Sequence, residues 1–212
     1  MNHRFDFWKS VLIVIGLTAV LWLVFLLQKA GLIDTTSFGN WPRHFEGLKG
    51  VIFSPFIHGS QQHLISNTLP LLVLMTVMLN AYPRVALAGL VFIHLLSGMM
   101  VWLLAPTDTV HIGISGIIYG IAAFLVASGV FRKDKLSAAI AMLVTMAYGG
   151  MVTGFVPVNG ISWQSHLYGA LSGILFAYLV RHVDLPAPHP FELEKVEEHR
   201  HFFDELQDNE KF

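Results

Sequence analysis

The sequence predicts an all-α membrane protein, a bundle of six transmembrane helices with a long first external loop. Its composition is 54% hydrophobic, and its 13 Lys and Arg and 14 Asp and Glu residues are separated by long uncharged intervals. A helix that spans a bilayer needs about 20 mostly apolar residues. Room for six such helices is provided by the uncharged residues 10–28, 50–83, 85–107, 109–131 and 136–180.

The length of the uncharged, mostly apolar runs places the spans within these intervals. The first span follows a basic leader, as a signal peptide does, but its length and the lack of a small-x-small cleavage site favour an uncleaved anchor. The loop between the first two spans, residues 29–62, is the only long one, and its aromatic content suggests that it lies in the membrane interface. We expect spans at 11–28, 63–82, 85–105, 114–131, 136–156 and 164–181.

The distribution of Lys and Arg predicts the orientation, because these residues are enriched on the cytoplasmic side. With the N-terminus inside, seven of the ten Lys and Arg residues that precede the tail lie inside, and only Lys29, Arg43 and Lys49 lie outside, all in the long loop. Six spans then also place the C-terminus in the cytoplasm. This arrangement fits a multi-pass protein of a bacterial inner membrane.

The chain is thereby divided into a cytoplasmic N-terminus (1–10), a six-span core (11–182) and an acidic cytoplasmic tail (183–212). From Asp184 onward the tail has nine acidic residues against three Lys or Arg, which is typical of a solvated appendage. A metal site formed by His189, His199 and His201 is the less favoured interpretation of this tail.

Polar residues on three spans are predicted to lie at the same depth. Ser115, His166 and Asn67 each precede the cytoplasmic arginine at the end of their span by 15 to 17 residues. A helical rise of about 1.5 Å per residue puts all three about 23–26 Å above the inner boundary. His63 lies one turn above Asn67. The four residues should therefore share a level just below the outer surface, where water can enter a cavity lined by protein.

Glycines suggest which of these spans are in contact. Gly116 and Gly120 are four residues apart on the fourth span, and Gly169 and Gly173 are four apart on the sixth. Small residues at this spacing let helix backbones approach closely in lipid. If these two faces pack together, Ser115 lies beside His166.

This pairing predicts a serine nucleophile with a histidine base. The chain has no cysteine, so covalent chemistry needs another nucleophile, and a serine hydroxyl becomes one when an imidazole accepts its proton. Ser115 begins a helix, whose unpaired N–H groups favour a developing negative charge. Gly113 would let a substrate carbonyl approach this backbone closely. These spans contain no carboxylate that could complete a triad, so we expect a dyad.

Three further side chains can support this chemistry. His63 and Asn67 are four residues apart on one helical face and could donate hydrogen bonds to an oxyanion. Tyr119 shares the face of Ser115 and could orient the imidazole ring. Taken singly, each of these residues is more often structural: a membrane serine bonds to its own helix, and a buried histidine packs in the core. We assign no catalytic role to His58, His94 or His111.

Three motifs resemble those of the rhomboid intramembrane serine proteases. GISGIIYG (113–120) resembles their G-x-S-G motif with its following tyrosine, and HGSQQHLISN (58–67) is similar to their second-span signature. SHLYGALSG (165–173) is similar to their last-span H-x-x-G-x-x-x-G pattern. The likeness extends over the six-span core, about residues 10–182. One departure is Trp41-Pro42-Arg43, where the family often has adjacent Trp and Arg.

The resemblance implies that the protein cleaves peptide bonds in or beside the membrane spans of substrate proteins, without a metal or cofactor. Expected partners are transmembrane protein substrates and the lipid bilayer, and no nucleic acid. The resemblance gives His58 a structural role, and the roles it implies for the site are nucleophile for Ser115, base and acid for His166, oxyanion donors for His63 and Asn67, a position beside the oxyanion hole for Gly113 and packing on His166 for Tyr119.

Two other functions compete with this hypothesis. A catalytically inactive rhomboid-like protein would bind client membrane helices without cleaving them, but such a protein is expected to have lost its serine or histidine. A small transporter or channel would use buried histidines as a proton path. It would need paired acidic residues in the membrane, and no Asp or Glu occurs between residues 47 and 107 or between 135 and 183.

Overall fold

The computed structural model describes residues 6–158 and 160–185, which are helical apart from loops and one isolated β-bridge. The long helices are α1 (Phe7–Lys29), α3 (Gln61–Ala81), α4 (Ala86–Leu104), α5 (Ser115–Phe131), α6 (Lys135–Tyr148) and α7 (Trp163–Leu179). A short helix, α2 (Leu48–Phe53), and the 3-10 segments η1 (Thr36–Phe38), η2 (Phe45–Gly47) and η3 (Ser54–Phe56) lie between α1 and α3. A fourth 3-10 segment, η4 (Gly149–Phe155), continues α6.

The long helices fall within a few residues of the predicted spans. Length and apolar composition qualify α1, α3, α4 and the continuous stretch of α6 and η4 as helices that can cross a membrane, whereas α5 is apolar but has 17 residues. The interval 136–156 differs from the expectation of one regular helix. Its α-helical part ends where Gly149 and Gly150, residues of low helix propensity, begin the 3-10 segment.

Side-chain caps fix the starts of three helices. Asp6 accepts a hydrogen bond from the N–H of Trp8 at the start of α1, and Ser60 accepts one from the N–H of His63 at the start of α3. Asp134 caps α6 in the same way. Each cap satisfies one of the N–H groups that a helix start leaves without an intrahelical partner.

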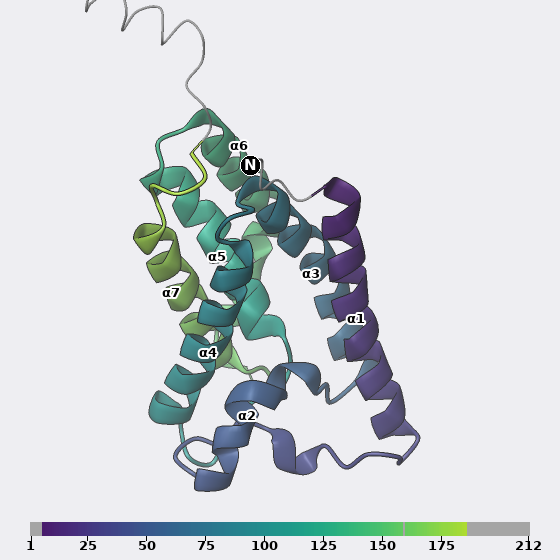
Figure 1. The fold of residues 1–212 in the computed structure, drawn as a ribbon. Coiled ribbons are helices and arrows are strands. Elements are labelled where there is room, and N and C mark those ends of the chain that lie inside the picture. Colours follow the sequence, from purple (N-terminus) through teal and green to yellow (C-terminus); the bar gives the residue numbers. More distant parts are fainter. Residues whose placement is uncertain (1–5, 159, 186–212) are drawn as a thin grey trace, which may run out of the picture.

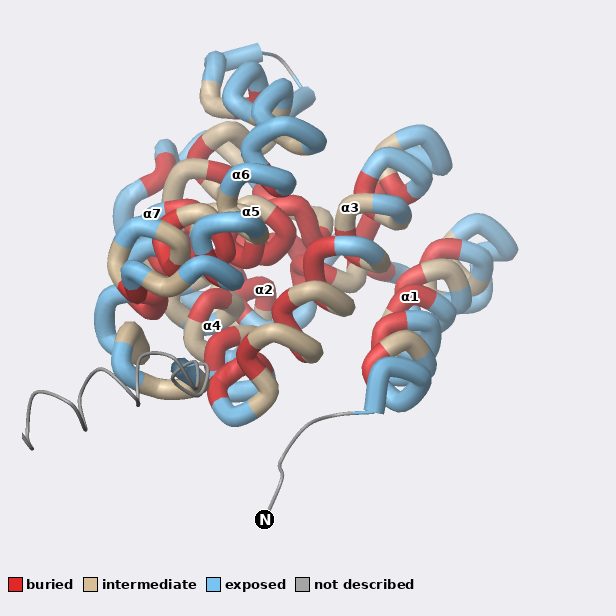
Figure 2. Tube along the Cα trace, turned by 90° about the horizontal axis from the view of Figure 1, so that it is seen from above, coloured by how far each residue is buried: buried red, intermediate tan, exposed pale blue. Residues whose placement is uncertain are grey.

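Helix α5 lies at the centre of the bundle. It contacts α3, α4, α6 and α7, and its buried residues include Ile118, Ile121, Phe124 and Leu125. Buried positions gather around α5 in Figure 2, whereas α1 stands at the edge and packs mainly against α3. The start of α1 and the end of α7 lie at one end of the bundle, and α2 lies at the other (Figure 1).

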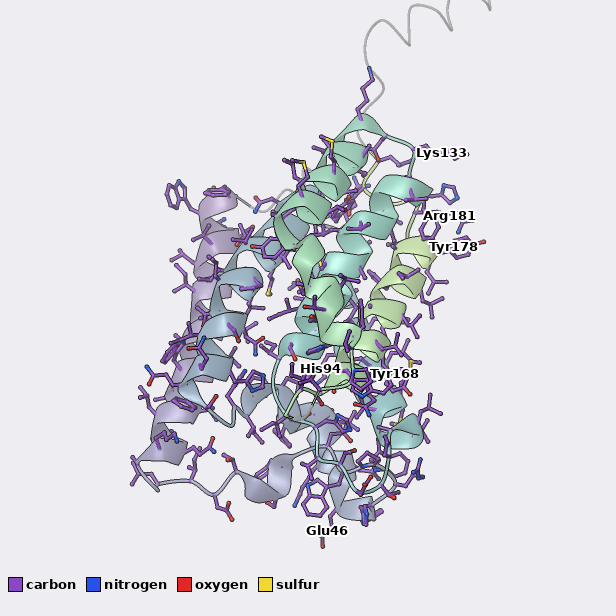
Figure 3. All side chains as sticks on the ribbon, turned by 180° about the vertical axis from the view of Figure 1, so that it is seen from behind. Glu46, His94, Lys133, Tyr168, Tyr178 and Arg181 are labelled. Atoms are coloured by element: carbon purple, nitrogen blue, oxygen red, sulfur yellow. The ribbon has the colours of Figure 1, made fainter. Side chains whose placement is uncertain are left out.

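The segment between α1 and α3 is anchored on α4. The Arg43 guanidinium donates to the carbonyl of Leu103 at 3.1 Å, so the Trp41-Pro42-Arg43 sequence docks at the end of α4. His94, to which we assigned no role, bonds to the carbonyl of Val51 in α2 at 2.9 Å. Glu46 lies at the end of the bundle opposite Lys133 and Arg181, with His94 between them (Figure 3).

Helices α5 and α7 meet backbone to backbone through their glycines. A Cβ atom added to Gly169 would lie 1.9 Å from the carbonyl oxygen of Gly116, and one added to Gly173 would lie 2.0 Å from that of Gly120. No real Cβ makes contacts this short, so only glycine fits at Gly169 and Gly173. The contact agrees with the spacing in the sequence.

We expect Gly169→Ala to lower the melting temperature of the protein in detergent, because the methyl group forces the backbones of α5 and α7 apart. Overpacking of this kind costs about 1–3 kcal/mol. The control is Gly16→Ala, since a Cβ at Gly16 meets nothing within 4 Å and alanine favours the helix. Equal melting temperatures for the two variants would contradict the close contact.

Candidate active site

The first residue of α5 and the first turn of α7 meet through two side chains. Ser115 Oγ lies 2.9 Å from His166 Nε2, within hydrogen-bonding distance. Both residues are buried, and the close approach of the glycine faces one turn further along brings the two helix starts together. The geometry therefore joins a hydroxyl to a potential base across two separate helices.

The other ring nitrogen of His166 defines the tautomer. Nδ1 lies 2.8 Å from the carbonyl oxygen of Gly154 in η4. A carbonyl oxygen can only accept, so Nδ1 carries the hydrogen and the neutral ring has its lone pair on Nε2. That nitrogen can accept the proton of Ser115. The backbone of Gly154 thus takes the orienting position that a carboxylate occupies in a catalytic triad.

Tyr119 packs flat against the imidazole. Its ring centroid lies 4.0 Å from that of His166, with only 5° between the ring planes. The Tyr119 hydroxyl donates to the carbonyl of Met151 at 2.7 Å. Because Met151 and Gly154 both belong to η4, this segment holds both the imidazole and the ring stacked on it.

The second-span residues line the cleft opposite the dyad. Gly113 has a φ of +98°, and a Cβ there would lie 2.7 Å from the ring of His63, so glycine is required by both conformation and space. Asn67 Nδ2 lies 3.2 Å from Nε2 of the fully buried His58. The amide retains a second hydrogen for another acceptor.

All six predicted site residues lie in one region. A cleft of about 740 Å³ is lined by Ser115, His166, His63, Asn67 and Tyr119, and Gly113 contacts His63 beside it. At the helix starts of α5 and α7, the first N–H groups have no intrahelical acceptor. The arrangement provides a nucleophile, a base and nearby hydrogen-bond donors.

Other residues of this region escaped sequence reasoning. The carbonyls of Gly154 and Met151 have no sequence signal, because any residue has a carbonyl group. Gln164, whose side chain lines the cleft and is 8% exposed, belongs to no motif. The tail histidines His189, His199 and His201 lie outside the described residues.

Comparison with known proteins supplies the family. The family model of the Rhomboid domain matches residues 46–183. The chain belongs to the rhomboid family. With its apolar helices, this membership makes it an integral membrane protein.

Several proteins resemble this rhomboid over most of its length. An uncharacterized protein of Mycobacterium tuberculosis is 39% identical over 79% of this chain and 76% of its own. An uncharacterized protein of Mycobacterium leprae is 34% identical over 84% of this chain and 74% of its own. Rhomboid-like protease 5 of Toxoplasma gondii is 25% identical over 72% of this chain and 18% of its own.

We expect the stability of this rhomboid to decrease in acid. Burial, with a smaller contribution from His63, lowers the pKa of His58 from 6.5 to about 4. Between these two pKa values the unfolded chain binds more protons than the folded chain. The contribution of the neutral His58 to the free energy of unfolding is therefore fully present above pH 6.5 and is lost as the pH falls toward 4. Melting temperatures in a pH series measure the effect. His58→Gln cannot titrate and should show a shallower decline, whereas an unchanged pH dependence would contradict the assignment.

Proposed function

We propose that this rhomboid is an intramembrane serine endopeptidase that cleaves peptide bonds in or next to transmembrane segments through Ser115 and His166. The observation that carries the proposal is the 2.9 Å contact between Ser115 Oγ and the unprotonated Nε2 of His166 within a cleft. The opposite ring nitrogen is held by Gly154, so the base already has the tautomer that the reaction needs.

Acylation begins when Ser115 Oγ attacks the carbonyl carbon of the scissile bond. The hydroxyl proton passes to His166 Nε2, and the carbonyl oxygen becomes an oxyanion. When the tetrahedral intermediate collapses, the C–N bond breaks and Nε2 returns its proton to the leaving amine. An ester to Ser115 remains. A water molecule then loses a proton to Nε2 and attacks the ester, which releases the acid and restores the serine.

Donors around Ser115 stabilise the oxyanion. The Ser115 N–H lies at the start of α5, where the helix dipole favours negative charge. His63 and Asn67 line the same cleft and supply side-chain donors, and Gly113 leaves room for the substrate backbone beside them. Donors that are already oriented stabilise the transition state without reorganisation. Tyr119 limits rotation of the imidazole during proton transfer.

The membrane topology that we propose has six spans, formed by α1 and α3 to α7, with residues 11–182 as the core. Both ends of the described chain lie at one end of the bundle (Figure 1). Lys133 and Arg181 lie at that end and Glu46 at the other (Figure 3). Basic residues mark the cytoplasmic side. We therefore place residues 1–10 and the acidic tail 183–212 in the cytoplasm, with the protein in a bacterial inner membrane.

The substrates that we propose are proteins with transmembrane helices that enter the cleft from the lipid. Amides within a helix are hydrogen-bonded and sterically covered, so a peptide bond reaches Ser115 only after local unwinding. Small or helix-breaking residues lower the cost of unwinding. The proposed reaction uses neither a metal ion nor a cofactor.

We expect purified protein in liposomes to cleave members of a panel of single-span substrates. Ser115→Ala and His166→Ala should each abolish measurable cleavage, because each removes one half of the proton transfer. Product bands on gels and mass spectrometry of the fragments provide the measurement. Cleavage that survives either substitution would reject the dyad. Binding of substrates by wild type without any cleavage would instead favour the inactive client-binding protein.

We expect Asn67→Ala to reduce kcat by roughly 10–1000-fold, because loss of one oriented oxyanion donor costs up to about 1000-fold. The Michaelis constant should change little, because the donor acts mainly on the transition state. Initial rates over a range of substrate concentrations separate the two parameters. An unchanged kcat in a stably folded variant would remove Asn67 from the oxyanion hole. Thr145→Ala, at an exposed hydroxyl bonded within its own helix, is the control.

A further inference from the structure

The ring of His111 bridges the segments that carry the two dyad residues. His111 lies four residues before Ser115, is 4% exposed and lines the same cleft. Its ring contacts the hydroxyls of Ser162 and Ser165 at the start of α7. His166 follows directly after Ser165. A single imidazole thus connects the approach to α5 with the first turn of α7.

The hydrogen bonds around His111 have one consistent direction. Thr109 Oγ1 donates its only hydrogen to the carbonyl of Pro106 at 2.6 Å. It must therefore accept from His111 Nε2, which lies 2.9 Å away. The neutral ring then has its lone pair on Nδ1, which accepts from Ser162 Oγ. Ser165 Oγ lies 3.1 Å from Ser162 Oγ and extends the chain. The ring is held in a single orientation.

The backbone of His111 is also fixed. Its N–H donates to the carbonyl of Asn40 at 3.0 Å, and its carbonyl accepts from the N–H of Asn40 at 2.9 Å. The Asn40 amide donates to the carbonyl of Gly98 in α4 at 2.8 Å. His111 is therefore held in place by Asn40, which is itself bonded to α4, and its ring forms a fixed hydrogen-bond acceptor for the start of α7.

We propose that His111 is a positioning residue that holds the start of α7 against the segment preceding Ser115 and so sets the distance between Ser115 and His166. The inference rests on the proposed function. The glycine contacts fix α5 and α7 on the cytoplasmic side of the dyad, and His111 fixes them on the outer side. A shift of about 1 Å in such a pair can cost about 100-fold in rate.

Three substitutions at His111 test the proposal. In His111→Asn, Oδ1 takes the place of Nδ1 and can accept from Ser162. In His111→Gln, the terminal amide takes the place of Nε2 and can bond only to Thr109. We expect His111→Ala and His111→Gln to lower kcat by about 10–100-fold with little change in KM. His111→Asn should retain most of the activity.

A double-mutant cycle tests the same contact from α7. The variant Ser162→Ala/Ser165→Ala should lower kcat as His111→Ala does, and combining all three changes should add little, because coupled residues are not additive. The labelling rate of Ser115 by a small fluorophosphonate reports dyad geometry without a protein substrate. In each of these variants the labelling rate should fall by about the same factor as kcat. Thr145→Ala, at an exposed hydroxyl bonded within α6, should label normally.

The outcomes separate this inference from the proposed function. The positioning role would be overturned if His111→Ala kept the kcat and the labelling rate of the wild type. It would also be overturned if His111→Gln were as active as His111→Asn. Either result would leave the protease proposal intact. Wild-type protein that neither cleaves nor labels would reject the protease itself. If the melting temperature shows that His111→Ala is unfolded, the positioning role is tested instead by comparing His111→Asn with His111→Gln and by the Ser162→Ala/Ser165→Ala variant.

Discussion

The backbone contact between α5 and α7 is the constraint on which the site depends. At Gly169 and Gly173 any side chain would overlap the carbonyl oxygens of Gly116 and Gly120. A lipid environment supplies no hydrophobic force between helices, so close van der Waals packing of this kind drives their association. The contact begins within one helical turn of Ser115 and His166, and it brings the two helix starts within the range of a hydrogen bond.

A membrane site of this kind can dispense with a carboxylate. An ionised acid within the bilayer is costly unless it is paired, whereas a backbone carbonyl is already part of the chain. Gly154 accepts from His166 Nδ1, and Met151 accepts from the hydroxyl of Tyr119. Both carbonyls belong to η4, so the position of this segment and the orientation of the imidazole are coupled. A displacement of η4 would release the ring and its stacking partner together.

The segment between α1 and α3, at the end of the bundle where α2 lies, supplies a frame for the cleft. Arg43 and His94 attach the segment between α1 and α3 to α4. Asn40 extends this attachment to His111 through a pair of backbone hydrogen bonds. These bonds satisfy carbonyls near the ends of α4 and α2 and the backbone groups of Asn40 and His111, which lie outside regular helices. Such pairing is a requirement where little water is present. His111, which lines the cleft, thus lies on an anchored loop, although loops are usually the mobile parts of a protein.

The sequence by itself determined the helical class and the approximate helix ranges, and it predicted the motif residues of the candidate site. Charge-free intervals are a local property, and the spacing to the arginines at the ends of three spans predicts depth without any structure. The glycine spacing even indicated which helices meet. Such signals are strong in a membrane chain because lipid requires every backbone group to bond within its own helix.

Only the tertiary structure decided the lateral contacts. The 2.9 Å separation of Ser115 and His166, the carbonyl of Gly154 on the opposite ring nitrogen and the hydroxyls around His111 each join segments far apart in the chain. Carbonyl partners have no residue type to reveal them, and the orientation of a histidine depends on what surrounds both of its nitrogens. The sequence can place these side chains only at a common depth. The packing of the helices then fixes the distances between them, and only that brings them together in one site.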